Sequence, residues 1–384
     1  MAERIRVLLL FGGRSAEHDV SRTSAVTVAA ALDPDRYDVV PVAITTEGRW
    51  LLAGEARAAL EGARDALPAA FRIEGAPVTE LPDPGTRTLV PLDANAPDAA
   101  LPTAFDVVLP LLHGPYGEDG TVQGLFELAG VPYVGSGVVG SAVAMDKVMM
   151  KHAFEAAGLP MARWRAFRDG HDGNEFVDRA MRELGVPCFV KPANLGSSVG
   201  VSKARDRDEL VAALDVALGF DEWAIVEEGI NGREIEVGIL GDDPPAASLP
   251  GEIVPGDDFY SYADKYEDDA AQLLAPAPLT DGQTAEVQGL AVRAFEACRC
   301  EAMARVDFFL EESGRDGGPG RGFLVNEVNT IPGFTSISMY PRLWEESGVS
   351  YSELLDRLVT MAITRHERRA RRAGRQRADR RSDG

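Results

Sequence analysis

The chain has 384 residues, of which 45% are hydrophobic and 26% charged. These are ordinary globular values, and they exclude a fibrous or intrinsically disordered protein. The formal net charge of −22 argues against a nucleic-acid-binding surface, because cationic side chains supply most of the affinity for nucleic acids.

The N-terminal part of the chain, 1–135, is predicted to be a Rossmann-like α/β domain with a parallel sheet. After charged residues, the apolar run 7–11 is too short for the core of a signal peptide, so we expect a cytoplasmic protein. The expected elements are a strand at 5–11, a helix at 17–32, a strand at 37–44, an Ala-rich helical insert at 53–75, a Pro-rich excursion at 76–104 and a strand at 105–112.

Two further domains are expected, a small central α+β domain at 136–227 and a C-terminal domain with an antiparallel sheet at 228–362. A loop dense in Gly, Asp and Tyr occupies 251–272. The expected helices lie at 145–157, 283–299 and 351–363, and the expected strands at 188–191, 223–227, 234–240, 305–310 and 323–329. The longest uncharged stretch, 128–145, contains four glycines and a proline, so we expect no membrane span.

The last residues, 363–384, form a basic tail. Residues 365–384 contain nine arginines and three acidic residues, which gives 9 − 3 = +6. Such a tail could be an arm for nucleic acid or a membrane, but a solvated, partly disordered extension of the last helix is the preferred interpretation. No function is assigned to it.

A glycine pattern at 135–140, GSGVVG, fits the dinucleotide-binding motif G-x-G-x-x-G. The true motif needs an acidic residue ending a second strand about 20 residues further on. That region here reads as a helix, so we interpret the segment as a crossover between domains.

A lysine at the end of a strand, Lys191, is followed by the small-residue loop 192–201 with two serines. Backbone N–H groups of such loops can contact phosphate oxygens, with a lysine as a compact charge partner. The chain has only five lysines against 34 arginines, so a lysine here indicates a specific need. Glu227 and Glu228 end an apolar strand, and Glu234 and Glu236 lie on one face of the next. Such glutamates could bind a ribose or an adenine amine, although each alone is more often solvated.

A polar face in the C-terminal domain is the strongest indication of chemistry. Side chains alternate across a strand, so Arg305 and Asp307 share one face, as do Glu327 and Asn329. If the two strands pair, hard oxygen ligands converge beside an arginine. Such ligands suit Mg²⁺ or Mn²⁺ held together with nucleotide phosphates.

These motifs, in this order, resemble the ATP-grasp superfamily and within it the D-alanine–D-alanine ligases. The resemblance runs from Val7 to about Met361, and the long insert at 53–104 and the basic tail depart from it. Its most specific pieces are GGRSAEHDVS at 12–21, HGPYGEDGTVQ at 113–123, and Arg305-Val306-Asp307 followed by EVNTIPG at 327–333.

The resemblance implies the ATP-grasp fold with three α/β domains, ATP and two Mg²⁺ ions (or Mn²⁺) as cofactors, small-molecule substrates, no nucleic-acid or membrane partner, and a homodimer. It implies that ATP activates one D-alanine as an acyl phosphate, which the amine of a second D-alanine attacks; the group that removes the amine's proton is not assigned. The implied nucleotide residues are Lys147, Lys191, Glu227, Glu228, Gly229, Ile230, Glu234 and, for the transferred phosphate, Lys265. The implied metal ligands are Asp307, Glu327 and Asn329. The implied substrate and catalytic residues are Glu17, His113, Ser197, Tyr266, Arg305, Gly333 and Ser338.

Two alternatives stay open. A related ligase making D-alanyl-D-lactate or D-alanyl-D-serine would share these motifs, but the depsipeptide enzymes resemble this chain with a His-containing loop where it has Lys265 and Tyr266. A cationic imidazole there would repel the ammonium form of D-alanine, so Tyr266 favours the dipeptide. An ATP-binding regulatory module without activity would require a degraded metal site, and all four polar residues of that face are present.

Overall fold

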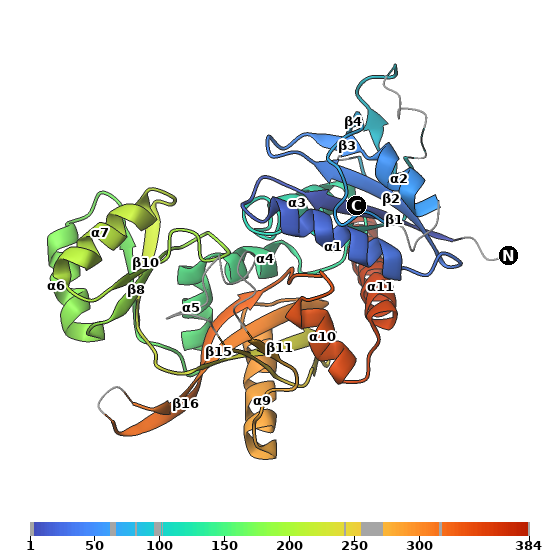
Figure 1. Ribbon diagram of the computed structural model, residues 1–384. Coiled ribbons are helices and arrows are strands. Elements are labelled where there is room, and N and C mark those ends of the chain that lie inside the picture. The colour runs from blue at the N-terminus through green and yellow to red at the C-terminus, as the bar shows by residue number, and fades with distance from the viewer. Residues whose placement is uncertain are drawn as a thin grey trace.

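A computed structural model describes residues 4–61, 67–80, 83–95, 101, 103–241, 243–254, 272–314 and 317–382. Three sheets organise the chain, in the order expected from the sequence. In Figure 1 the first sheet and the second sheet lie at opposite ends of the molecule, and the third lies between and below them. Within the described residues, no helix combines the length and the apolarity needed to cross a membrane.

The first sheet has the order β5-β4-β3-β2-β1-β6 and is mixed, which corrects the expectation of a parallel sheet. Its strands are β1 (Ile5–Gly12), β2 (Tyr37–Ile44), β3 (Trp50–Leu52), β4 (Ala76–Thr79), β5 (Val90–Pro91) and β6 (Val107–Pro110). Only β2, β1 and β6 are parallel. The tight turn 45–49 connects β2 to β3, and so short a connection permits only antiparallel pairing.

Helices α1 (His18–Ala31), α2 (Gly54–Glu61) and α3 (Thr121–Ala129) accompany the first sheet. Of the insert expected to be helical at 53–75, α2 covers the start and the described residues 67–75 are not helical, whereas the Pro-rich part adds β4 and β5 to the sheet edge. Short strands that carry prolines are typical of sheet edges, since proline has no N–H to donate.

The second sheet is antiparallel with the order β7-β10-β8-β9. It consists of β7 (Trp164–Arg168), β8 (Cys188–Pro192), β9 (Ser202–Ala204) and β10 (Trp223–Glu228), with helices α6 (Gly173–Leu184) and α7 (Arg207–Leu218). Apolar side chains of both helices and of the strands, among them Phe167, Phe176, Val190 and Leu214, form one core. This small unit holds one wall of the site described below.

The third sheet is antiparallel, as expected, with the order β14-β13-β11-β15-β16 and β12 paired to β11. Its strands are β11 (Arg233–Leu240), β12 (Ala246–Ala247), β13 (Gly251–Val254), β14 (Gln272–Leu274), β15 (Met303–Ser313) and β16 (Pro319–Asn329). Helix α9 (Asp281–Ala297) packs on it, as do α4 (Val138–Met145) and α5 (Lys147–Ala156), whose Met150 and Phe154 join its core. The expected helix at 145–157 is α5.

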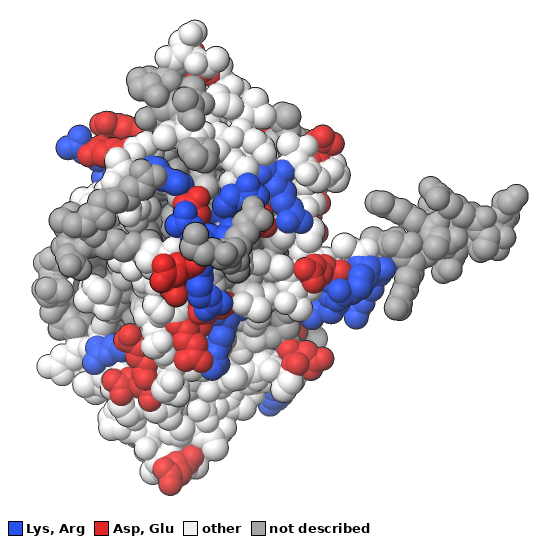
Figure 2. All heavy atoms as spheres, turned by 90° about the vertical axis from the view of Figure 1, so that its right-hand side faces the viewer, with Lys and Arg blue, Asp and Glu red and all other residues white. Residues whose placement is uncertain are grey.

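The C-terminal helices are α10 (Met339–Glu346) and α11 (Tyr351–Ser382). Leu354, Leu355 and Leu358 of α11 join the core of the first domain beside Val7 and Leu9. The helix continues to Ser382, as expected for an extension of the last helix, and the partial disorder of the basic tail stays a prediction. Where α11 leaves the body of the molecule, basic and acidic side chains lie side by side (Figure 2).

A buried arginine holds the beginning of the basic tail against the body of the molecule. Arg365 is only 3% exposed and donates hydrogen bonds to the carbonyls of Tyr133 (2.7 Å) and Gly135 (2.6 Å). Glu301 pairs with Arg365 at 3.3 Å and with Arg369 at 2.7 Å. The glycine-rich crossover expected at 135–140 is therefore fixed between the first domain, the third sheet and α11.

Candidate active site

A cavity of about 850 Å³ lies where the three sheets meet. All three domains line it: Glu17 and His113 from the first, Lys191 and Glu227 from the second, and Arg305 with its neighbours from the third. Residues that are far apart in the sequence therefore face one space large enough for a small-molecule ligand.

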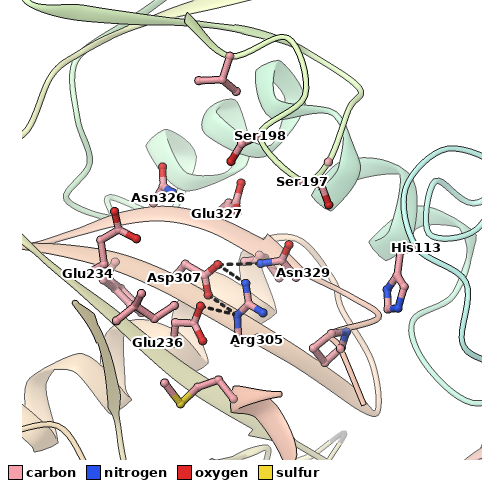
Figure 3. Close-up of a pocket in the computed structure, with 18 of the residues that line it drawn as sticks. His113, Ser197, Ser198, Glu234, Glu236, Arg305, Asp307, Asn326, Glu327 and Asn329 are labelled. Atoms are coloured by element: carbon pink, nitrogen blue, oxygen red, sulfur yellow. Dashed lines mark hydrogen bonds and ion pairs between the residues drawn. The ribbon is translucent and has the colours of Figure 1, made fainter. Parts of the chain in front are cut away.

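The floor of the cavity is the polar face of β15 and β16 (Figure 3). In the strand register Asp307 lies opposite Glu327, and Arg305 lies opposite Asn329, as the alternation of side chains predicted. The Arg305 guanidinium donates to both Asp307 oxygens at 2.8 and 2.7 Å, and Asn329 Nδ2 donates to Asp307 Oδ2 at 2.9 Å. Arg305, Asp307 and Asn329 therefore form one connected polar surface, with Glu327 opposite Asp307 in the register.

Arg305 is the electrostatic centre of this floor. Burial alone would lower the pKa of its guanidinium, but Asp307 and Glu236 hold that pKa well above its usual value. Glu236, from the neighbouring strand β11, lies 3.1 Å from Arg305 Nε. The arginine is a permanent cation flanked by carboxylates, so it can donate hydrogen bonds to an oxyanion above the floor.

Two lysines line the wall of the second domain and α5. Lys147 Nζ donates to the Leu195 carbonyl at 2.5 Å, and Lys191 Nζ lies 2.7 Å from Glu227 Oε2. Burial lowers the pKa of Lys147, only partly offset by Glu327; burial would also lower that of Lys191, but Glu227 and Glu327 raise it. Two amines thus point toward the carboxylate-rich floor.

The predicted nucleotide segment 227–230 is only partly in the cavity. Glu227, Glu228 and Ile230 line it, whereas Gly229 does not, and the Gly229 N–H donates to the Pro187 carbonyl at 3.0 Å. The Glu228 carboxylate is paired with Arg163 at 2.7 Å and Arg321 at 2.6 Å. Glu234, on β11, lines the cavity as predicted (Figure 3).

The first domain contributes Glu17 and His113. Glu17 precedes α1, and a Cβ built on Gly196 would lie 3.5 Å from its Oε2, so the serine loop reaches this carboxylate. In that loop Ser197 and Ser198 have φ of 52° and 57°, and Ser197 Oγ is buried with no hydrogen-bond partner among the described residues. Left-handed φ angles at two consecutive serines indicate a strained backbone, and such strain is common at ligand sites.

His113 is 6% exposed and its Nδ1 lies 2.9 Å from the Ile331 carbonyl. Its Nε2 is buried and has no hydrogen-bond partner in the described ranges. Because Ile331 follows β16, this bond joins the first domain to the loop that begins at the cavity floor. An unsatisfied ring nitrogen beside a cavity is free to bind a ligand oxygen.

Gly333 and Ser338 lie together after β16. Ser338 Oγ accepts a hydrogen bond from the Thr335 N–H at 3.0 Å, and a Cβ on Gly333 would come within 2.7 Å of that Oγ. Only glycine fits without movement, so this loop is packed closely around Ser338. Lys265 and Tyr266 lie outside the described residues.

Three lining or supporting residues were not predicted. Glu118 accepts hydrogen bonds from Gly114 N (2.9 Å) and Ile331 N (3.3 Å), and burial raises the pKa of its carboxyl to about 7. Glu236 pairs with Arg305, and Lys151 pairs with Glu227 from behind the cavity wall. The scarcity of lysine was the available signal for Lys151. Glu236 shares a strand face with Glu234, and Glu118 lies in the motif at 113–123, but neither was assigned a role in the site.

The donors on the floor fit a divalent cation by their chemistry. In the described part of the chain, no three His, Cys, Asp or Glu side chains are grouped as a ready metal site. Asp307, Glu327 and Asn329 supply two carboxylates and an amide on one face. A set this small is typical of Mg²⁺ sites that ligand phosphates and water complete.

Two family models match the chain, "D-ala D-ala ligase N-terminus" over residues 6–136 and "D-ala D-ala ligase C-terminus" over 153–360. Similar proteins include the D-alanine–D-alanine ligase of Bacillus licheniformis, 45% identical over 95% of this chain and 97% of the relative. That of Bacillus velezensis is 46% identical over 93% of this chain and 97% of the relative.

Solved structures of ligases from this family have similar folds. The D-alanine–D-alanine ligase from Coxiella burnetii has a TM-score of 0.81 at 34% identity and covers 99% of this chain and 100% of its own. A D-Ala:D-Ser ligase from Enterococcus faecalis has a TM-score of 0.79 at 31% identity, covering 94% of this chain and 100% of its own. The predicted resemblance is therefore confirmed over nearly the whole length.

Proposed function

Because the chain belongs to the D-alanine–D-alanine ligase family, we propose that it joins two D-alanine molecules to D-alanyl-D-alanine, driven by ATP, for peptidoglycan precursor synthesis. The observation that carries this proposal is the single cavity in which the three sheets bring the basic wall, the carboxylate floor and Glu17 together. A carboxylate is unreactive toward an amine at neutral pH, so one D-alanine must first be activated as its acyl phosphate.

The wall and floor would hold the nucleotide. Lys147 and Lys191 supply cations for the phosphates, and Glu227, the backbone of Glu228 and Ile230, and Glu234 lie along the path of the nucleoside. Asp307, Glu327 and Asn329 would hold two Mg²⁺ ions, for which Mn²⁺ could substitute; bound there, the ions would neutralise phosphate charge. The chain's own part is to position the transferred phosphate over the floor and exclude water.

The other side of the cavity would hold the amino acids. We assign Glu17 to the ammonium of the first D-alanine, His113 to its carboxylate, and Ser338 with the Met339 backbone to the carboxylate of the second. Arg305 and the Gly333 N–H would stabilise the oxyanion that forms when the second amine attacks. Ser197 would join Glu17 and Tyr266 in latching the loop that carries Lys265, which would reach the transferred phosphate.

The acceptor is the open choice within the family. The Enterococcus faecalis D-Ala:D-Ser ligase has a similar fold at 31% identity, whereas D-alanine–D-alanine ligases match at 45–46%. Phosphate release from ATP, measured in parallel with D-alanine, L-alanine, D-lactate and D-serine, tests the assignment. With D-alanine as the donor, D-alanyl-D-lactate or D-alanyl-D-serine as the main product of an equimolar mixture of acceptors would contradict the dipeptide assignment.

We also propose that the protein is a cytoplasmic homodimer. Sedimentation of the purified protein tests the oligomeric state, and a monomer at micromolar concentration would contradict it. Both statements follow from the resemblance to a biosynthetic ligase and not from a contact within this chain. The domain limits 1–135, 136–227 and 228–362 stay a proposal, checked by limited proteolysis at the two junctions.

A further inference from the structure

Lys151 is a charged side chain buried behind the nucleotide wall. It lies one helical turn after Lys147 on α5, is 2% exposed, and does not line the cavity. Its neighbours on α5, Met150 and Phe154, belong to the apolar core of the third sheet. Burying an ammonium group in apolar surroundings costs free energy unless the group is paired, so Lys151 requires a partner of opposite charge.

That partner is Glu227, the last but one residue of β10. Lys151 Nζ lies 2.7 Å from Glu227 Oε1, and Lys191 Nζ lies 2.7 Å from Glu227 Oε2. Each carboxylate oxygen therefore has its own cation, one behind the wall and one in the cavity. Burial would raise the pKa of Glu227, but the two lysines lower it well below its usual value.

The arrangement fixes what Glu227 can recognise. A carboxylate held ionised by two cations accepts hydrogen bonds and cannot donate them. Glu227 lines the cavity, so a ligand there can contact its carboxylate. An exocyclic amino group placed there would donate to it, whereas a carbonyl oxygen at the same position would meet a negative charge and leave a buried polar group unpaired.

We propose that Lys151 is a positioning residue that makes this site select an amino-substituted purine over an oxo-substituted one. It does so by holding Glu227 ionised and oriented from behind the wall, without touching the nucleotide. The inference rests on the proposed function, since it takes the cavity to hold a purine nucleotide. Of the chain's five lysines, Lys147, Lys151 and Lys191 gather at this wall, in a sequence that otherwise uses arginine.

The test compares ATP with inosine triphosphate, which carries a carbonyl in place of the amino group. Phosphate release at saturating D-alanine gives kcat/KM for each nucleotide. The wild type should prefer ATP by ~10-fold or more, the range that one mismatched buried hydrogen bond produces. Equal use of both nucleotides by the wild type would overturn the proposal, whereas no release with either would overturn the proposed function instead.

Lys151→Met keeps the length of the side chain and removes its charge. It should raise KM for ATP and leave KM for D-alanine at saturating ATP unchanged. The preference for ATP over inosine triphosphate should fall to roughly a few-fold at most. Lys203→Met, in the same domain but outside the cavity wall, is the control and should keep the wild-type preference. If Lys151→Met lowers kcat/KM for both nucleotides equally, Lys151 is only structural.

Lys151→Met leaves Glu227 with one cation, so this variant could lose its fold. Lys151→Met combined with Glu227→Gln removes the Lys151–Glu227 ion pair and leaves Lys191 charged, and it is compared with Glu227→Gln alone. An amide can turn its NH₂ toward a carbonyl, so the double variant should use inosine triphosphate nearly as well as ATP. Because Lys151 acts through Glu227, the double variant and Glu227→Gln alone should show the same ratio of kcat/KM for ATP to that for inosine triphosphate. Different ratios in the two variants, or retention of the wild-type preference in either, would overturn the proposal.

Discussion

Replacement of Glu118 by glutamine should remove a pH dependence from the stability of this protein. Burial raises the pKa of the Glu118 carboxyl to about 7, from an ordinary value of 4.5. One pH unit of difference corresponds to about 1.4 kcal/mol, so the ionised carboxylate destabilises the folded state by roughly 3 kcal/mol relative to the unfolded chain. The proximity of Glu17 adds to this effect, and His113 opposes it.

The sign follows from proton uptake. Between pH 4.5 and 7 the folded protein binds more protons at Glu118 than the unfolded chain does, so the free energy of unfolding falls as pH rises through this range. Glutamine does not titrate. It keeps an acceptor for the Gly114 N–H but loses the 3.3 Å bond from the Ile331 N–H, a cost of about 1 kcal/mol that is the same at every pH.

Urea unfolding of both proteins at pH 5, 6, 7 and 8 measures the effect. Between pH 5 and 8 the wild type should lose roughly 2 to 3 kcal/mol that Glu118→Gln does not lose, so the variant becomes the more stable protein at pH 8. Glu286→Gln removes an exposed carboxyl on α9 and should follow the wild type. Parallel curves for wild type and Glu118→Gln would refute the reasoning.

Three further outcomes are expected. Asp307→Asn or Glu327→Gln should reduce ligase turnover by ~100-fold or more at ordinary Mg²⁺ while circular dichroism stays unchanged, because the phosphates lose charge compensation worth several kcal/mol; near-native turnover would remove these residues from the site. Tyr266→His, in the segment that the structure does not describe, should raise the share of D-lactate product most at low pH, where imidazole is protonated. The ratio of dipeptide to depsipeptide product, measured from about pH 6 to 8.5, tests this expectation. Identical ratios in the wild type and the variant would contradict it. Arg365→Met should cost ~2–4 kcal/mol in urea unfolding because two carbonyls and Glu301 lose a buried partner, while exposed Arg371→Met should change stability by less than ~0.5 kcal/mol; equal effects would contradict the buried contact.

The cavity floor could be predicted from the sequence because it follows from a local rule. Side chains alternate along a strand, and the register Asp307–Glu327 and Arg305–Asn329 confirms the predicted juxtaposition. The register shift between Asp307 and Phe308 did not disturb it, because all four residues lie on the same side of that shift. The order of the three sheets likewise followed from motif order.

Residues that act through distant partners could not be predicted. Lys151 occupies a position that helix periodicity assigns to an apolar core, and its partner Glu227 is distant in the sequence, on strand β10. Arg365 is one of nine similar arginines, and composition alone does not show that it meets two backbone carbonyls. The mixed first sheet was missed because proline-rich segments read as loops, whereas short edge strands tolerate prolines.

The first domain is built from both ends of the chain. Its core combines β1 and α1 with the leucines of α11, and Arg36, the residue before β2, pairs with Asp356 of α11. During synthesis the ribosome releases β1 more than 300 residues before α11. The nascent first domain therefore keeps part of its apolar surface exposed during synthesis. Its core is completed only when translation is nearly finished. Premature termination near residue 350 would leave an open, aggregation-prone first domain beside two sheets that have already formed.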